Sequence, residues 1–187
     1  FHRTQHKSPE HDPEEAMIDI IAGKFGFYES FISNHAIGDV SFEIIEELCS
    51  ELCAESSYQA ALIGFIKAWP KPCLLLYCKP SLKKNEQAML AQGSFGFIDP
   101  LTPSLRAVKI TPSIPAIAMG FRVHQNMRVP ESSVIHSVFN GDSDYAEAEE
   151  NLSSWEVSSG SCLPDCAVIV KAKRHSGGVY VIISPSN

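Results

Sequence analysis

Cysteine and histidine side chains are the first candidates for chemistry in this chain. The cysteines include two Cys-x-x-x-Cys pairs, Cys49/Cys53 and Cys162/Cys166. On a helix, Cys49 and Cys53 share one face, so they could bind zinc together or pack inward, and their apolar neighbours predict packing. Cys162 and Cys166 lie in a predicted loop and could join His175 in a metal site, but a clear fourth ligand is missing. We therefore predict reduced, structural cysteines and no metal site.

A catalytic cysteine or serine would need a histidine base, for which His124, His136 and His175 are the candidates. Sequence spacing does not bring any of them to a nucleophile, so a structural role is predicted for each. Residues 160–163 (Gly-Ser-Cys-Leu) lack the second glycine of a nucleophile elbow. Gly-rich phosphate-binding fingerprints are absent as well. These observations predict a protein that is not an enzyme, with no catalytic or cofactor-binding residue.

An acidic segment at residues 141–151 offers carboxylates for a cation. Asn140, Asp142 and Asp144 alternate as at the start of a calcium loop, but the expected glycine and distal glutamate positions are not met. The segment contains no basic residue, which favours a solvated acidic loop. We expect this loop to lead into a short helix around residues 145–152.

Composition excludes several classes of function. The 187 residues carry a net charge of -7, with 44% hydrophobic and 20% charged residues, as in an ordinary globular domain. The chain has no run of five basic residues, which argues against tight binding of nucleic acid by this chain alone. Its apolar runs are far too short to span a bilayer.

One segment has clear helical periodicity. Apolar residues recur every three or four positions between Ile44 and Cys53, with glutamates between them. Ser41 or Asp39 could cap the N-terminus, and early glutamates complement the helix dipole. This pattern predicts one early helix at about residues 41–55.

Most of the remaining chain reads as short strands separated by proline and glycine. A hairpin-like turn is predicted at residues 174–178. The polar segment at residues 80–87, which contains Lys83 and Lys84, is expected to be an exposed loop. Residues 1–15 read as a flexible N-terminal arm, and residues 16–187 as one domain. Many strands with one helix predict a mainly β domain, a single jelly-roll β-sandwich. The expected strands cover residues 58–69, 73–78, 89–98, 105–111, 117–124, 134–139, 167–173 and 179–184.

A short aromatic run suggests a family. Residues 25–31 (Phe-Gly-Phe-Tyr-Glu-Ser-Phe) resemble a segment of the large coat protein of comoviruses, in which the segment lies late in the chain rather than near its start. The order of elements is similar to that of the small coat proteins of the same picorna-like plant virus family, Secoviridae, including the cheravirus type. Those proteins have an opening strand, comparable to residues 17–24 here, and a helix before the main strands, comparable to residues 41–53.

The resemblance implies a structural virion protein: one jelly-roll subunit of an icosahedral capsid that encloses single-stranded RNA. The implied partners are sister capsid proteins in a hetero-oligomeric shell, with RNA contacted indirectly and no membrane. The implied locations are the virion and, during assembly, the host cytoplasm. Phe1 would then be a polyprotein cleavage boundary.

Two other classes of function stay open. One is a β-sandwich module that binds a receptor or glycan through its loops. The other, less favoured, is a thiol hydrolase that uses Cys162 or Cys49 with a histidine.

Overall fold

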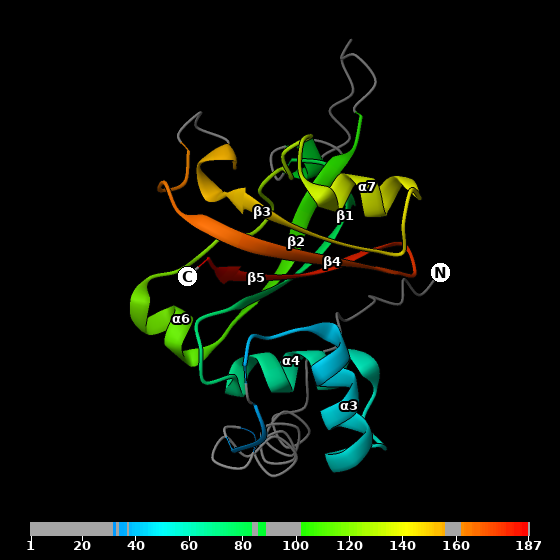
Figure 1. Cartoon of the computed structure of the whole chain (residues 1–187). Helices are drawn as coiled ribbons and strands as arrows, with labels where there is room; N and C mark the ends of the chain where they lie inside the picture. The colour runs from blue at the N-terminus through cyan, green and yellow to red at the C-terminus, as the bar shows by residue number, and fades with distance from the viewer. Residues whose placement is uncertain are drawn as a thin grey trace, which may run out of the picture.

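Five strands form one antiparallel sheet in the order β2-β1-β5-β4-β3 (Figure 1). The structure, a computed structural model, describes residues 32, 34–36, 38–83, 86–88, 102–155 and 162–186. The strands are β1 (Leu74–Ser81), β2 (Ser104–Pro112), β3 (Tyr145–Asn151), β4 (Ala167–His175) and β5 (Gly178–Pro185). The expectation of a mainly β domain is confirmed, and the pairing of its strands is antiparallel.

Alternating side chains on the central strands enter two separate hydrophobic cores. Leu74 and Leu76 of β1 belong to one core, whereas Leu75 belongs to the other. On β5, Val181 and Ile182 divide in the same way. Because successive side chains of a strand point to opposite faces, a strand that is apolar at every position is covered on both faces.

Two helices cover the first face of the sheet, α3 (Phe42–Leu52) and α4 (Tyr58–Ala68) (Figure 1). Each begins at a serine N-cap: Ser41 Oγ accepts from Ile44 N, and Ser57 Oγ accepts from Ala60 N. Helix α4 is apolar on most of its surface and buries Leu62, Phe65 and Ile66 among others. It ends before Pro70, which disfavours a helical conformation for the residue that precedes it.

The second face is covered by α7 (Val134–Asn140), by residues 121–129 and by Trp155. Helix α6 (Ile114–Met119) precedes these segments in sequence and lies at one end of the sheet (Figure 1), and η1 (Leu152–Ser154) follows β3. Helices α6 and α7 each end at a glycine with positive φ, Gly120 (69°) and Gly141 (103°), a conformation that other residues adopt at a cost.

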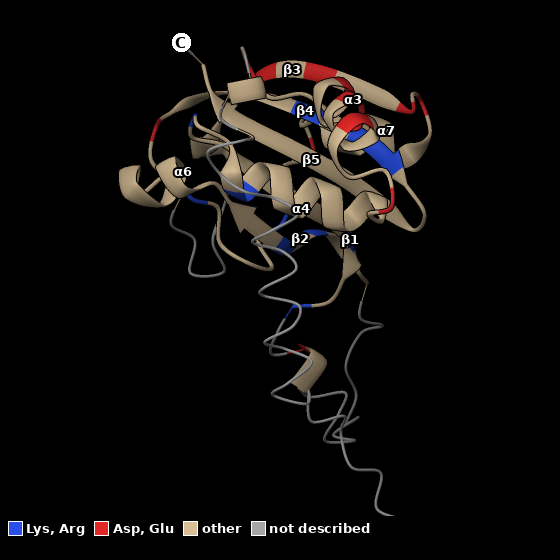
Figure 2. Cartoon of the chain, turned by 90° about the horizontal axis from the view of Figure 1, so that it is seen from below, with Lys and Arg blue, Asp and Glu red and all other residues tan. Residues whose placement is uncertain are grey.

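The acidic residues of β3 mark one edge of the sheet (Figure 2). Its partner β4 supplies basic residues, and Lys171 Nζ lies 3.8 Å from Glu147 Oε1. The next strand, β5, is joined to β4 by a tight hairpin in which His175 pairs with Gly178 and Gly177 has a φ of 74°. This hairpin confirms the turn predicted at residues 174–178.

Several sequence predictions agree with the described elements. The helix expected at about 41–55 is α3, which stops at Leu52 because Cys53 leaves the helical conformation (φ -152°, ψ 48°). The strands expected at 73–78, 105–111, 167–173 and 179–184 correspond to β1, β2, β4 and β5.

Four other predictions were wrong. Residues 58–69 and 134–139 are helices α4 and α7 rather than strands, and residues 117–124 contain the end of α6 followed by irregular chain. The short helix expected around 145–152 is strand β3, followed by the turn η1. In α4 the apolar residues are nearly continuous because the helix is buried against the sheet, so the run resembles a buried strand. Helix α7 is too short for its apolar residues to show a helical period.

The finer prediction of a jelly roll requires two packed sheets. The described residues form one sheet with helices on both faces. The arm at 1–15, the opening strand at 17–24, the aromatic run at 25–31 and the strand at 89–98 lie outside the described residues. Within the described part of the chain, no helix is both long and apolar enough to cross a membrane.

Candidate functional site: a basic pocket beside β2 and α7

A pocket of about 540 Å³ opens between the paired ends of β1 and β2 and the helix α7. This volume falls within the range of small-molecule sites. Its wall contains three cationic side chains and one carboxylate, together with apolar and neutral polar groups. The lining residues that carry the argument are Lys83, Glu86, Arg106, Arg128, His136 and Phe139.

Arg106 is the charged residue held most firmly in this wall. Its side chain lies on β2, and the residue is only 5% exposed. The guanidinium donates to Ser81 O (3.2 Å), Asn126 O (3.0 Å) and Ser104 Oγ (3.4 Å). These partners are neutral, so within the described residues the buried cation is hydrogen-bonded but not paired with a carboxylate.

A short irregular segment brings a second arginine beside the first. Residues 126–129 run along β2: Asn126 N donates to Ala107 O (2.7 Å), and Ala107 N donates to Met127 O (3.0 Å). Arg106 and Arg128 form an isolated antiparallel bridge in this pairing. Burial lowers the pKa of Arg106, and the Arg128 charge acts in the same direction, while Glu86 opposes it. The site thus concentrates positive charge.

Helix α7 contributes a histidine and an aromatic ring. His136 and Phe139 both line the pocket, and they lie three residues apart on one helix face. The Nε2 atom of His136 is buried and has no hydrogen-bond partner within the described residues. A buried polar atom without a partner is uncommon and marks a place where a ligand group could bind.

The two cysteine pairs occupy different surroundings. Cys49 and Cys53 lie at the end of α3, where their Sγ atoms are 3.8 Å apart. Cys162 is exposed, and Cys166 lies just before β4 with its Sγ 3.7 Å from Ala167 O. Within the described residues, no group of three or more His, Cys, Asp or Glu side chains could hold a metal ion.

The three histidines considered as bases also lie in different surroundings. His124 is exposed and follows α6, His136 lines the basic pocket, and His175 stacks against Tyr58 and Tyr180 at ring-centroid distances of 5.8 and 5.0 Å. In the described part of the chain, no hydrogen bond joins any of these three histidines to a cysteine thiol.

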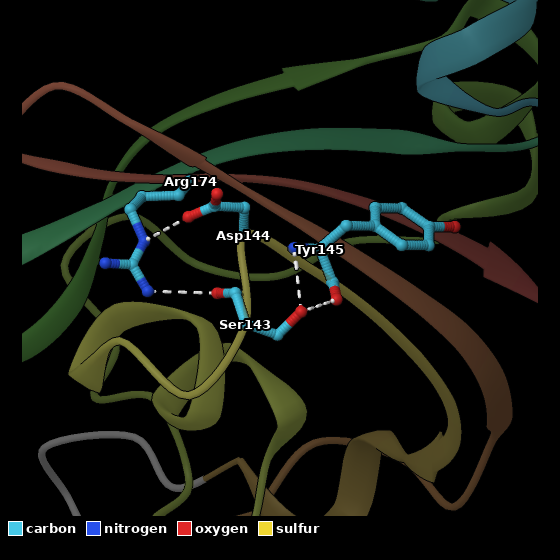
Figure 3. Close-up of polar contacts among 4 residues, drawn as sticks. All are labelled: Ser143, Asp144, Tyr145 and Arg174. Atoms are coloured by element: carbon cyan, nitrogen blue, oxygen red, sulfur yellow. Dashed lines mark hydrogen bonds and ion pairs between the residues drawn. The ribbon is translucent and has the colours of Figure 1, made fainter.

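The acidic residues that resemble a calcium loop are engaged with the protein itself. Arg174 Nε lies 3.2 Å from Asp144 Oδ1, and another Arg174 nitrogen donates to Ser143 O (3.0 Å) (Figure 3). Asp142 accepts from Ser137 Oγ (3.2 Å) at the end of α7. The predicted acidic loop is therefore a turn joined to β4, followed by a strand.

Comparison with known proteins does not assign the chain to a family. No protein-family model matches the chain, and no curated protein is similar to it.

His136 was considered in the sequence only as a base, and the other pocket residues that carry the argument were not recognised as a site because they come from four separated segments. The one usable signal is Arg106, a charged side chain between Leu105 and Ala107 in a predicted strand. A charged residue in an apolar strand is rarely fully buried without a partner, and here it indicates a polar site at the strand end.

Proposed function

We propose that this domain binds a small organic anion in the basic pocket, and that its function is recognition of that ligand. The observation that carries the proposal is the buried Arg106, aligned with Arg128 in a pocket that also contains Lys83. Guanidinium groups bind carboxylates and phosphates through two parallel hydrogen bonds, and partial burial strengthens such contacts.

The rest of the pocket wall suggests the shape of the ligand. Phe139, Leu105 and two prolines provide apolar surface in the same wall as the cations. His136 Nε2 adds one polar contact, which can be a donor or an acceptor. These features favour a ligand with an acidic group on an apolar or aromatic body.

A matched set of aromatic probes tests this proposal. Thermal unfolding of the purified chain is measured with benzoate, phenyl phosphate, benzyl alcohol and benzylamine at equal concentration. The two anions should raise the unfolding temperature, because a ligand that binds the folded state stabilises it by mass action. The neutral and cationic analogues should not.

Variants identify the site. Arg128→Ala and Lys83→Ala should abolish the shift caused by the anions, whereas Arg122→Ala, an exposed arginine outside the pocket, should keep it. Equal shifts for all four probes, or shifts that persist in Arg128→Ala and Lys83→Ala, would contradict the proposal.

The capsid subunit is the second candidate, and one structural feature favours it. Helix α6 exposes three large apolar side chains, Ile114 (51%), Ile117 (64%) and Met119 (67%). Apolar side chains gathered on a surface are typical of protein interfaces. In this interpretation the domain assembles with sister chains into a virion, is released from a polyprotein and has a jelly-roll fold.

Assembly distinguishes the two candidates. Size-exclusion chromatography and electron microscopy of the chain with its co-expressed sister chains should reveal particles if the capsid interpretation is correct. A monodisperse monomer that never assembles with such partners would overturn it, and the same monomer would suit the ligand-binding domain. A pull-down or glycan screen of that monomer tests a further alternative, a β-sandwich module that binds a receptor or glycan.

A further inference from the structure

Two thiols meet at the end of helix α3, on the opposite side of the sheet from the basic pocket. Cys49 and Cys53 are both partly exposed, and the Cys53 thiol donates to Cys49 Sγ at 3.8 Å. The other thiols differ: Cys73 and Cys78 are buried, and Cys162 and Cys166 carry no thiol–thiol contact within the described residues.

The backbone at this pair is suited to a covalent link. Residues four apart on a helix have Cα atoms about 6 Å apart, within the range that a disulfide tolerates. Cys53 is the C-cap, and its φ of -152° places it outside the helix, so its side chain is not held by a helical rotamer. The Sγ atoms need to approach by about 1.8 Å to reach the length of an S–S bond.

We propose that Cys49 and Cys53 form a redox-active dithiol that reacts with low-molecular-weight disulfides and closes to an intramolecular disulfide. The site is independent of the ligand pocket and of assembly. Its co-reactant is a small organic disulfide, which supplies the oxidising equivalents.

The reaction proceeds in two exchanges. The Cys53 thiolate attacks one sulfur of the organic disulfide, which breaks the S–S bond and releases one organic thiolate. The Cys49 thiol loses its proton to water and attacks the Cys53 sulfur, which forms the protein disulfide and releases the second organic thiolate. Two protein thiols are oxidised, and one organic disulfide is reduced to two thiols.

The properties of the two thiols set the order in which they react, and the surrounding charge sets the preferred co-reactant. Burial raises the pKa of the Cys49 thiol, and Cys53 at the C-cap lies outside the helix, so Cys53 is assigned the first step and Cys49 the second. The exposed Glu47, Glu51 and Glu55 surround the end of α3. This negative charge favours a cationic disulfide over an anionic one.

The test compares cystamine, a cationic disulfide, with oxidised glutathione, an anionic one. The purified chain is treated with each, blocked with iodoacetamide and analysed by peptide mass spectrometry. We expect a Cys49–Cys53 cross-link that has lost two hydrogen atoms, formed faster with cystamine. The exposed Cys162, which has no thiol–thiol contact within the described residues, is the internal control and should form a mixed disulfide.

Single variants test the order of the two steps. Cys49→Ser should retain the cystamine adduct on Cys53 because the closing thiol is gone, and Cys53→Ser should react slowly. A wild-type protein that accumulates open mixed disulfides at this pair would overturn the proposal. So would one in which Cys162 reacts while Cys49 and Cys53 stay reduced.

Discussion

Arg106 and Arg128 face each other across an isolated antiparallel bridge, yet they differ in burial and in partners. Arg106 is 5% exposed and donates three hydrogen bonds, whereas the Arg128 side chain is 56% exposed and pairs with Glu131. The two arginines should therefore contribute unequally to folding although both line the pocket.

Arg106→Met should lower the free energy of unfolding by about 1–3 kcal/mol, because it removes the donors to two carbonyls and a hydroxyl at a buried position. Arg128→Met should cost less than about 0.5 kcal/mol, as is usual for an exposed side chain. Urea unfolding of both variants measures the difference. Equal losses would show that Arg106 is not a structural residue of the pocket wall.

Gly178 should not tolerate a side chain. A Cβ atom at this position would lie 2.4 Å from Cys78 O and 2.9 Å from Tyr77 Cζ. Gly178→Ala therefore forces β1 and β5 apart, and the expected loss is about 1–3 kcal/mol of unfolding free energy.

Its neighbour Gly177 is the matched control. Gly177 has a φ of 74°, and a Cβ atom added there would have no neighbour within 4 Å. Gly177→Ala should therefore cost only the backbone strain, about 1–2 kcal/mol. Gly177→Asn should be more stable than Gly177→Ala, because asparagine tolerates this backbone conformation. Gly178→Asn should be no more stable than Gly178→Ala. Recovery at both positions would contradict the steric explanation.

Local signals in the sequence predict some of this fold, and tertiary packing decides the rest. The periodic glutamates and leucines of α3 are visible because one face of that helix remains in solvent. Helix α4 lacks this contrast, since it is packed against both the sheet and α3, and its apolar run reads as a strand. Strand β3 shows the reverse error: its glutamates look like a loop but form a sheet edge beside Lys171.

The candidate site is less predictable than the fold. Arg106 and Arg128 are 22 positions apart, and the pairing of residues 126–129 with β2 has no short-range sequence signal. By contrast, Cys49 and Cys53 are four positions apart on a predicted helix, so their contact follows from helical geometry.

Ser113 should be the most important of the serine caps. Its hydroxyl is buried, accepts from Cys73 N (3.0 Å) and Ala116 N (3.2 Å), and donates to Lys71 O (3.0 Å). Ser113→Ala leaves these groups unpaired and should cost about 1–3 kcal/mol.

The exposed cap of α4 provides the comparison for Ser113. Ser57→Ala removes one hydrogen bond, from Ala60 N, and should cost about 0.5–1 kcal/mol. Denaturant unfolding of the two variants gives both values. A Ser57→Ala loss as large as that of Ser113→Ala would show that the bonds of Ser113 with Cys73 and Lys71, just before β1, add nothing beyond capping.

Glu150 should make the stability of the domain depend on pH. Its Oε1 accepts from Ser133 Oγ (2.9 Å) and Val134 N (2.8 Å) at the start of α7. Burial raises the pKa of this carboxyl above its ordinary value, although both hydrogen bonds act to lower it. The folded state therefore binds this proton more tightly than the unfolded state does.

The sign follows from linkage between proton binding and folding. The contribution of Glu150 to stability is greatest below the unfolded pKa, about 4.3, and is lost as the pH rises through the folded pKa. Glu150→Gln keeps an acceptor for both donors but has no proton to lose. The unfolding free energy of the wild type minus that of Glu150→Gln should decrease as the pH rises from about 4, and should level off once the pH exceeds the folded pKa of Glu150. Glu149→Gln, an exposed neighbour on β3, should follow the wild-type trend, and a constant difference for Glu150→Gln would contradict the raised pKa.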